Sequence, residues 1–215
     1  GSTKPAENLK VTSSVTYTNT KGDRIQQGSN ISGVMLGLMR TPPTFDNSYG
    51  YKFNDPDYRF LGQRTYRNGG GYDNPYWVSH EIPTTDDVNR MLGNINIEWD
   101  INDWMKLSYR GGLDFVSTYR RVAWAPNSNG ARPGFASTFN STSTDQNHDL
   151  YLNITRDLTE DLKLTALLGY NMYETDYQST TASANDINII DFYDVSNTTD
   201  IKGFENEFGY RTKAF

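Results

Sequence analysis

Residues 89–119, NRMLGNINIEWDINDWMKLSYRGGLDFVSTY, alternate apolar and polar side chains along two segments that flank a polar bend at 100–103. The apolar positions before the bend are Met91, Ile95, Ile97 and Trp99. Those after it are Met105, Leu107, Tyr109, Leu113 and Phe115. Successive side chains of a strand point to opposite faces, so a period of two predicts two half-buried strands joined as a β-hairpin.

The two arms of this hairpin have the dimensions and the polarity of membrane-crossing strands. Each arm is about as long as the roughly 9–11 residues that a tilted strand needs to cross a bilayer. The face opposite the apolar one carries amide and charged side chains, among them Asn94, Asn96, Glu98, Lys106 and Arg110. A strand pair with one apolar and one polar face fits lipid on one side and water on the other.

The turn of the hairpin recurs twice in the chain. Residues 100–107 align with 157–164, and a third copy of the turn lies at 4–11. Three related turns predict an up-and-down antiparallel meander. The residues that we expect to face lipid are Ile95, Ile97, Trp99, Met105, Leu107, Tyr109, Leu113, Phe115, Leu162, Leu164 and Leu168.

The lengths of the connections decide between two kinds of β protein. Soluble β-sandwiches also alternate and also use Asx-rich turns, so alternation alone leaves a soluble domain open. The predicted short connections are at about 5–8, 100–103 and 157–161, and the long ones at about 20–88, 120–145 and 179–202. Outer-membrane barrels separate short periplasmic turns from long extracellular loops, whereas a sandwich has no reason to do so. The sequence therefore predicts an all-β fold, a partial transmembrane β-barrel of about six strands plus a strand tail.

Composition agrees with this fold class. The chain has 215 residues, of which 35% are hydrophobic and 13% aromatic, with fifteen tyrosines, a mixture typical of outer-membrane barrels with polar, aromatic loops. No run reaches the eighteen apolar residues of a transmembrane helix, so a membrane role would use strands. Zero cysteines exclude a disulfide framework and thiolate metal sites. A net charge of −6 without a basic patch argues against nucleic acid.

The long connections contain one helical pattern. Apolar residues recur at helical spacing within 29–40, with Ser29 or Asn30 as the expected start and Pro42 just beyond the end. We expect this helix to pack on loop or barrel wall rather than to bind a partner. The pair Asp86 and Asp87 is interpreted as turn-forming.

No residue pattern indicates catalysis. The two histidines, His80 and His148, lie far apart, and no carboxylate spacing matches an EF-hand loop. We therefore expect no enzyme activity, no cofactor and no metal site. The aromatic residues Tyr72, Tyr76, Trp77 and Trp124 lie in or beside long loops, where packing or an interfacial girdle is their ordinary role. They are also the candidates for stacking on a ligand.

In the order and spacing of its segments, the chain resembles an internal piece of the β-barrel of a SusC/RagA-type TonB-dependent outer-membrane transporter. The segments that carry the resemblance are 5–11, 40–44, 74–77 and 89–115. The ending is also similar, with a strand after Glu205 and Asn206, and the likeness as a whole covers nearly the whole chain. The resemblance implies that residues 1–215 are part of a single barrel domain of a TonB-dependent receptor, and that the plug domain and the remaining strands are absent from this sequence.

The resemblance also implies a function and partners. The family imports oligosaccharides or peptides across the outer membrane of Gram-negative bacteria, is powered by TonB through an N-terminal region missing here, and carries a SusD-like surface lipoprotein on its extracellular face. This segment would supply barrel wall in contact with lipid, and extracellular loops. Two alternatives remain: a secreted soluble β domain that binds carbohydrate through exposed aromatics, and an energy-independent porin-type channel. Nothing in the sequence identifies the substrate.

Overall fold

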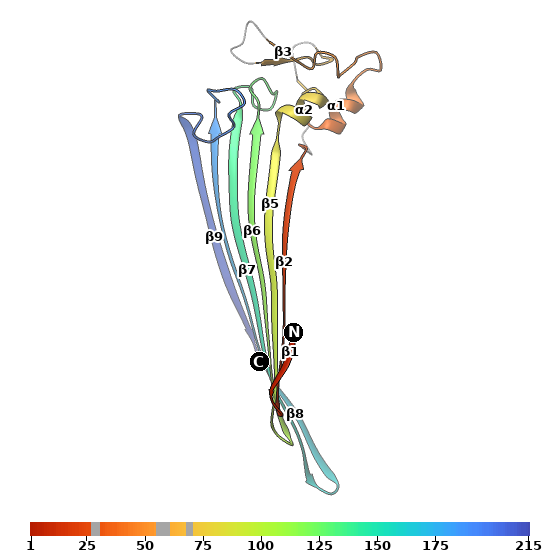
Figure 1. Cartoon of the computed structure of the whole chain (residues 1–215), viewed down its shortest axis with the longest axis vertical. Coiled ribbons are helices and arrows are strands. Elements are labelled where there is room, and N and C mark those ends of the chain that lie inside the picture. Colours follow the sequence, from red (N-terminus) through yellow and green to blue (C-terminus); the bar gives the residue numbers. More distant parts are fainter. Residues whose placement is uncertain (27–30, 55–60, 68–70) are drawn as a thin grey trace.

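The computed structural model describes residues 1–26, 31–54, 61–67 and 71–215. It contains a seven-stranded antiparallel sheet whose spatial order, β1-β2-β5-β6-β7-β8-β9, is also the order along the chain (Figure 1). The strands are β1 (Ser2–Ala6), β2 (Leu9–Arg24), β5 (Thr84–Asn102), β6 (Met105–Trp124), β7 (Phe135–Thr159), β8 (Leu162–Asn185) and β9 (Asp200–Ala214). The predicted meander of six strands plus a strand tail is confirmed, and the seven strands form an open sheet rather than a closed barrel.

Short turns join the strands at one end of the sheet, as the sequence predicts (Figure 1). Only residues 7–8, 103–104 and 160–161 separate the paired strands there. In the β5–β6 turn, the side-chain oxygen of Asn102 accepts a hydrogen bond from the backbone N–H of Trp104 at 3.1 Å. Such an Asx bond closes a tight turn locally. The adjacent turn is tied to it because the Asn8 amide donates to the carbonyl of Asp100 at 3.1 Å.

The strands are longer at the other end than the sequence predicts. β7 has 25 residues and β8 has 24, so the loops there are only 125–134 and 186–199. The prediction of long excursions over 120–145 and 179–202 is therefore wrong. The prediction that Asp86 and Asp87 form a turn is also wrong, because both lie inside β5. Serine- and threonine-rich strands that are polar on both faces lack the apolar alternation used to predict strands, although their backbone ladder forms equally well.

Directly paired residues of neighbouring antiparallel strands share a face of the sheet, so the register shows which side chains lie together. One row across five strands reads Leu9, Trp99, Leu107, Leu152 and Leu168. The next row reads Val11, Ile97, Tyr109, Leu150 and Tyr170. We call this side the apolar face and the other side the polar face. All eleven residues that are predicted to face lipid lie on the apolar face.

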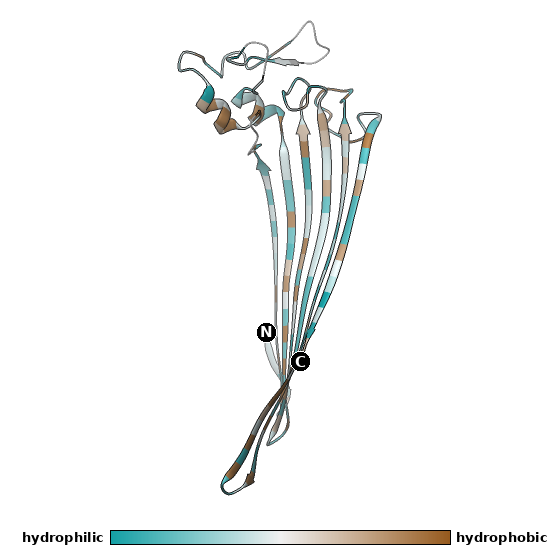
Figure 2. Cartoon of the chain, turned by 180° about the vertical axis from the view of Figure 1, so that it is seen from behind, coloured by the Kyte–Doolittle hydropathy of each residue, from teal (hydrophilic) through white to brown (hydrophobic). Residues whose placement is uncertain are grey.

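The apolar residues of this face form a band that slants across the sheet. On β6 the band reaches Phe115, but the same row continues into Thr144 on β7 and Asp176 on β8. On β8 the band lies closer to the short turns and includes Leu162 and Leu164, in the hairpin that projects farthest in Figure 2. Strands of a barrel tilt and stagger, so a belt perpendicular to the barrel axis meets each strand at a different residue.

The polar face carries hydrogen-bonded and charged side chains along the same strands. Arg90 on β5 donates from Nε and Nη2 to both carboxylate oxygens of Asp114 on β6, at 2.9 and 2.6 Å. On β7, Asp145 accepts from the hydroxyls of Tyr173 and Thr175 at 3.1 and 2.7 Å. These cross-strand networks satisfy polar groups on the side that the alternation predicts to be wet.

The connection between β2 and β5 folds into four short elements. They are α1 (Val34–Arg40), β3 (Lys52–Asn54), β4 (Leu61–Gln63) and α2 (Pro75–Glu81). None of the helices formed by the described residues is long and apolar enough to cross a membrane.

The first helix is shorter than predicted, and the second is not predicted from the sequence. α1 begins after Gly33, its N-cap, whereas Ser29 and Asn30 lie outside the described residues. It ends before Pro42 as expected. The second helix, α2, has a clear start signal, because Asn74 is its N-cap and Pro75 its first helical residue.

Candidate functional site

At the end of the sheet opposite the short turns, the chain forms what we call the loop cap (Figure 1). The loop cap comprises the described residues of 25–83 and the loops 125–134 and 186–199. Its core consists of Trp77, Val78, Ile82 and Ala125, and partly buried Val34, Tyr51, Trp124 and Tyr193 pack against it. Contributions from all three connections mean that they fold as one unit.

A buried carboxylate holds several cap segments together. Asp73 is almost fully buried, and its Oδ1 accepts hydrogen bonds from the Gln63 amide at 2.6 Å and from the Asn129 backbone N–H at 2.7 Å. Its Oδ2 accepts a hydrogen bond from the hydroxyl of Ser32. A buried polar group needs such partners to offset the loss of water. Asp73 therefore acts as a structural hub that joins four stretches of loop.

The neighbouring Asn74 serves the same purpose through its amide. Its Nδ2 donates to the carbonyls of Asn47 and Arg64 at 2.9 and 2.7 Å, and its Oδ1 accepts from the Tyr76 backbone N–H at 2.8 Å. The last bond caps α2 and orients the helix within the cap.

Trp77 follows on α2 and is fully buried in the cap core. Its indole Nε1 donates to the hydroxyl of Ser128 at 2.8 Å. A fully buried ring has no face available to a ligand. The interpretation of Trp77 as a ligand-stacking residue is therefore corrected: in this structure it is the anchor of the cap core.

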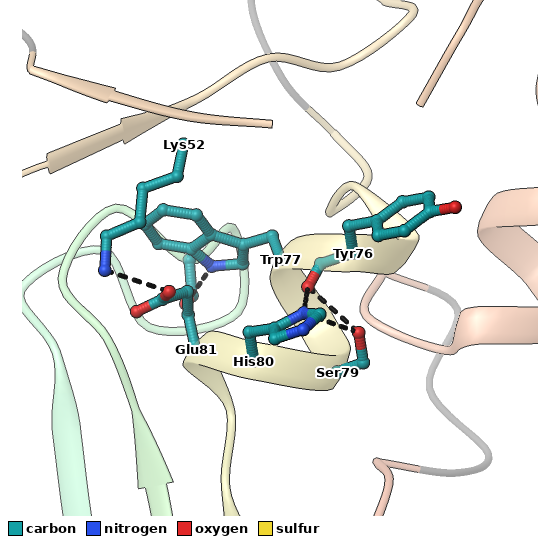
Figure 3. Close-up of polar contacts among 7 residues, drawn as sticks. Lys52, Tyr76, Trp77, Ser79, His80 and Glu81 are labelled. Carbon is teal, nitrogen blue, oxygen red and sulfur yellow. Dashed lines mark hydrogen bonds and ion pairs between the residues drawn. The ribbon is translucent and has the colours of Figure 1, made fainter. Parts of the chain in front are cut away.

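Beside the core, α2 forms an ion pair with β3. Lys52 donates from Nζ to the carboxylate of Glu81 at 2.9 Å (Figure 3). Burial by itself lowers the pKa of Lys52, but the hydrogen bond to Glu81 and its charge outweigh burial, so the pKa is raised overall. Burial, followed by the negative charge of Glu81, raises the pKa of the Tyr193 phenol. Both groups keep their protonated forms across the neutral range.

Of the four candidate aromatics, Tyr76 presents the most exposed ring. Its side chain is 42% exposed, and its ring lies 5.9 Å from that of Tyr51, which in turn lies 5.5 Å from the imidazole of His80. The Nδ1 of His80 lies 2.7 Å from the carbonyl oxygen of Tyr76, within the same helix turn (Figure 3). The exposed rings of Tyr76 and His80 therefore lie beside half-buried Tyr51, which also packs against the cap core.

The other two candidates have partners within the chain. The guanidinium of Arg40 lies 4.4 Å from the ring centre of Tyr72, and the ring of Tyr66 is stacked on it at 6.2 Å. Trp124 is half-buried and lines a cavity of about 470 Å³ formed with residues 130–135 and Asn185. The structure thus spreads the four residues over different parts of the cap rather than gathering them at one site.

A second cavity, of about 340 Å³, lies between β6 and the loop 186–199. Its polar lining includes Arg121, which donates to the carbonyl of Tyr193 at 2.8 Å, and Asp194. Backbone and side-chain hydrogen bonds from Ser196 lower the pKa of Asp194. Sequence reasoning missed this cavity because its walls come from segments far apart in the chain.

The helical stripe predicted to pack on the loop or wall is largely exposed. Met35 and Met39 on α1 are 71% and 80% exposed, and Leu38 is exposed as well. Val34 alone on this helix packs against the cap core. The expectation of a packed apolar stripe is therefore wrong for these three residues, which leave a small apolar surface on α1.

In the described parts of the chain, no three histidine, cysteine, aspartate or glutamate side chains group as a metal site would require. The second histidine, His148, lies on the sheet with its Nδ1 2.7 Å from the hydroxyl of Tyr109.

No protein-family model and no curated protein sequence matches the chain. Solved structures do. A chain of the RagAB peptide transporter superposes with a TM-score of 0.68 at 13% identity, covering 99% of this chain and 24% of that chain. The RagAB peptide importer in its 'closed-closed' and 'open-open' states gives TM-scores of 0.64 and 0.66 at 13% and 14% identity, each covering 98% of this chain and 24% of the other. The chain spans about a quarter of the length of these solved chains, and at this identity the likeness establishes the fold.

Proposed function

We propose that this chain is part of the barrel wall and extracellular loops of an outer-membrane transporter that imports peptides or oligosaccharides. Import is powered through TonB, and a SusD-like surface lipoprotein sits over the loop cap. The protein acts as a transporter rather than as an enzyme.

The slanted apolar band is the observation that carries this proposal. A soluble sheet buries its apolar face against another layer, yet in the described structure no layer covers the apolar face along the strands. A lipid belt accounts for an uncovered apolar face, for its limited height and for its slant across tilted strands. The superposition on RagAB chains, which belong to a peptide transporter, supports the same conclusion.

Strand length provides further support. Crossing a bilayer takes about 9–11 residues of a tilted strand, whereas β5 to β8 have 19 to 25. The excess lies on the side of the loop cap, beyond the apolar band. The cap is therefore held well outside the lipid, where a surface lipoprotein can reach it, and exposed Met35, Leu38 and Met39 offer an apolar contact on α1.

The proposal is tested by uptake in Gram-negative cells that produce the complete protein containing this chain. Fluorescent oligopeptides and oligosaccharides are supplied in parallel, with and without a functional TonB. We expect outer-membrane fractionation of the protein and TonB-dependent uptake of one substrate class. Uptake that persists without TonB would instead establish the porin-type channel.

The soluble alternative has its own test. The edges of this sheet carry unpaired backbone groups, and open edges promote association. We expect the isolated 215 residues to require detergent. A sharp monomeric peak without detergent, with cooperative unfolding, would contradict the barrel assignment.

A further inference from the structure

Two arginines share one buried carboxylate on the polar face, close to the loop cap. Asp86 on β5 accepts a hydrogen bond from Nε of Arg24 on β2 and, at 2.6 Å, from Nε of Arg120 on β6. The Asp86 side chain is 3% exposed, whereas those of Arg24 and Arg120 are 58% and 49% exposed. A buried anion thus holds two exposed guanidiniums side by side across three strands.

The way these arginines bind leaves their donors available. Each arginine donates to Asp86 through Nε alone. Among the described residues, the terminal nitrogens of the two arginines have no hydrogen-bond partner. By contrast, Arg90 donates to Asp114 from both Nε and Nη2, so both donors on that side of its guanidinium are paired. One ion pair of this two-donor kind is enough to link two strands. Two exposed guanidiniums beside one carboxylate have donors left to bind a second oxyanion, because guanidinium groups bind carboxylates with paired donors.

The surrounding charge favours an anion. In the four rows of the polar face nearest the loop cap, the described strand residues carry three cations, Arg24, Arg120 and Lys202, against two carboxylates, Asp86 and Asp200. Farther toward the short turns, carboxylates such as Asp114, Asp145 and Asp149 are frequent on the same face. A substrate carboxylate entering from the cap therefore meets this surplus of positive charge before it reaches Asp114, Asp145 and Asp149.

We propose that Arg24 and Arg120, positioned by Asp86, bind the carboxylate of a transported ligand on the inner wall below the loop cap. The inference rests on the proposed function, because it takes the polar face as the lumen. The carboxylate belongs to a peptide terminus or to an acidic sugar, which share this chemistry. Asp86 is a positioning residue, and the two guanidiniums make the contact.

The test measures binding to the complete protein in detergent, independently of uptake. The probes are N-acetyl-tetraalanine against its C-terminal amide, and trigalacturonate against its methyl ester. We expect at least one acid to bind more tightly than its neutral form. Arg24→Gln and Arg120→Gln should each weaken that acid about tenfold or more, because a hydrogen bond to a charged group is lost. Binding of the neutral form should not change.

Two further variants keep the result interpretable. Arg211→Gln is the matched control: Arg211 is 52% exposed and pairs with Glu174, but on the apolar face, so its loss should not affect binding. Arg24→Lys keeps the ion pair to Asp86 and the charge, so it should fold like the parent protein and bind the acid with intermediate affinity.

The outcomes separate the site from the transport function. If the acid binds more tightly than the neutral form only for the peptide probe, or only for the sugar probe, that probe identifies the source of the carboxylate. Equal binding of acid and neutral probes, unchanged affinity in both Arg→Gln variants, or an equal loss in Arg211→Gln would overturn the site. Normal acid binding without any uptake by cells would instead refute the transport function and leave the site standing.

Discussion

The sheet and the loop cap are stabilised in different ways. The cap buries Trp77, Val78 and Ile82 in a core of its own and satisfies Asp73 within it. The strands bury few large side chains, and residues such as Ile95 and Leu168 stay exposed on the apolar face. The cap therefore has a core of its own, whereas no layer of the described residues covers the apolar face along the strands.

Removal of the cap's central side chain should have the largest effect. Trp77→Ala should destabilise the cap by about 3–5 kcal/mol, because it deletes a buried ring and leaves a cavity. The sheet should keep its structure, since the strand residue that packs against the cap core, Trp124, lies at the very end of β6. Limited proteolysis should show new cleavage within 31–83 while the protected strand fragments persist.

The neighbouring Tyr76→Ala serves as the matched control. Tyr76 lies on the same helix, but its ring is outside the core, so cap protection should change little. Equal protease sensitivity in the two variants would show that the cap does not depend on the Trp77 core.

A smaller loss of cap stability is expected when the buried carboxylate of Asp73 is replaced. Asp73→Asn replaces one acceptor oxygen by an NH₂ group among donors from Ser32, Gln63 and Asn129. Leaving a buried donor unpaired costs about 1–3 kcal/mol. Hydrogen exchange should accelerate in the cap and not in β5–β8, while exposed Asp103→Asn should change neither. Faster exchange throughout the strands would contradict the separation of the two regions.

The same contrast explains what the sequence predicts well. Strand faces and short turns follow from side-chain alternation, which is strong from Ile95 to Leu113. Beyond the band, stretches such as 140–144 and 178–181 contain no apolar residue, so no alternation marks them. The cap could not be derived because its contacts join distant segments, as Trp77 and Ser128 do. One missed element, α2, does carry a local signal in Asn74 and Pro75.

Alkaline pH should destabilise the cap rather than the sheet, and by less than the substitutions above. The pKa values of Lys52 and Tyr193 are raised in the folded cap. Their stabilising contribution is therefore complete below the unfolded values of about 10, and is lost as pH rises through the folded ones. Fluorescence of Trp77 and Trp124, recorded with Trp99 and Trp104 replaced by Phe, should report loosening of the cap above about pH 10. Tyr193→Phe, which cannot ionise, should move the transition upward. If the transition stays at the same pH in this variant, ionisation of Tyr193 does not cause the loosening of the cap.

We propose that the apolar face of the sheet contacts lipid and that the polar face contacts water. Ile95 and Asn94 are neighbours on β5 that point to opposite faces, midway along the band. The decisive measurement is the free energy of folding of the complete protein into bilayers for Ile95→Arg and Asn94→Arg. We expect Ile95→Arg to cost about 2–4 kcal/mol, as an arginine does at the midplane of the lipid face, and Asn94→Arg to cost far less. Equal penalties, or a larger penalty for Asn94→Arg, would contradict the assignment.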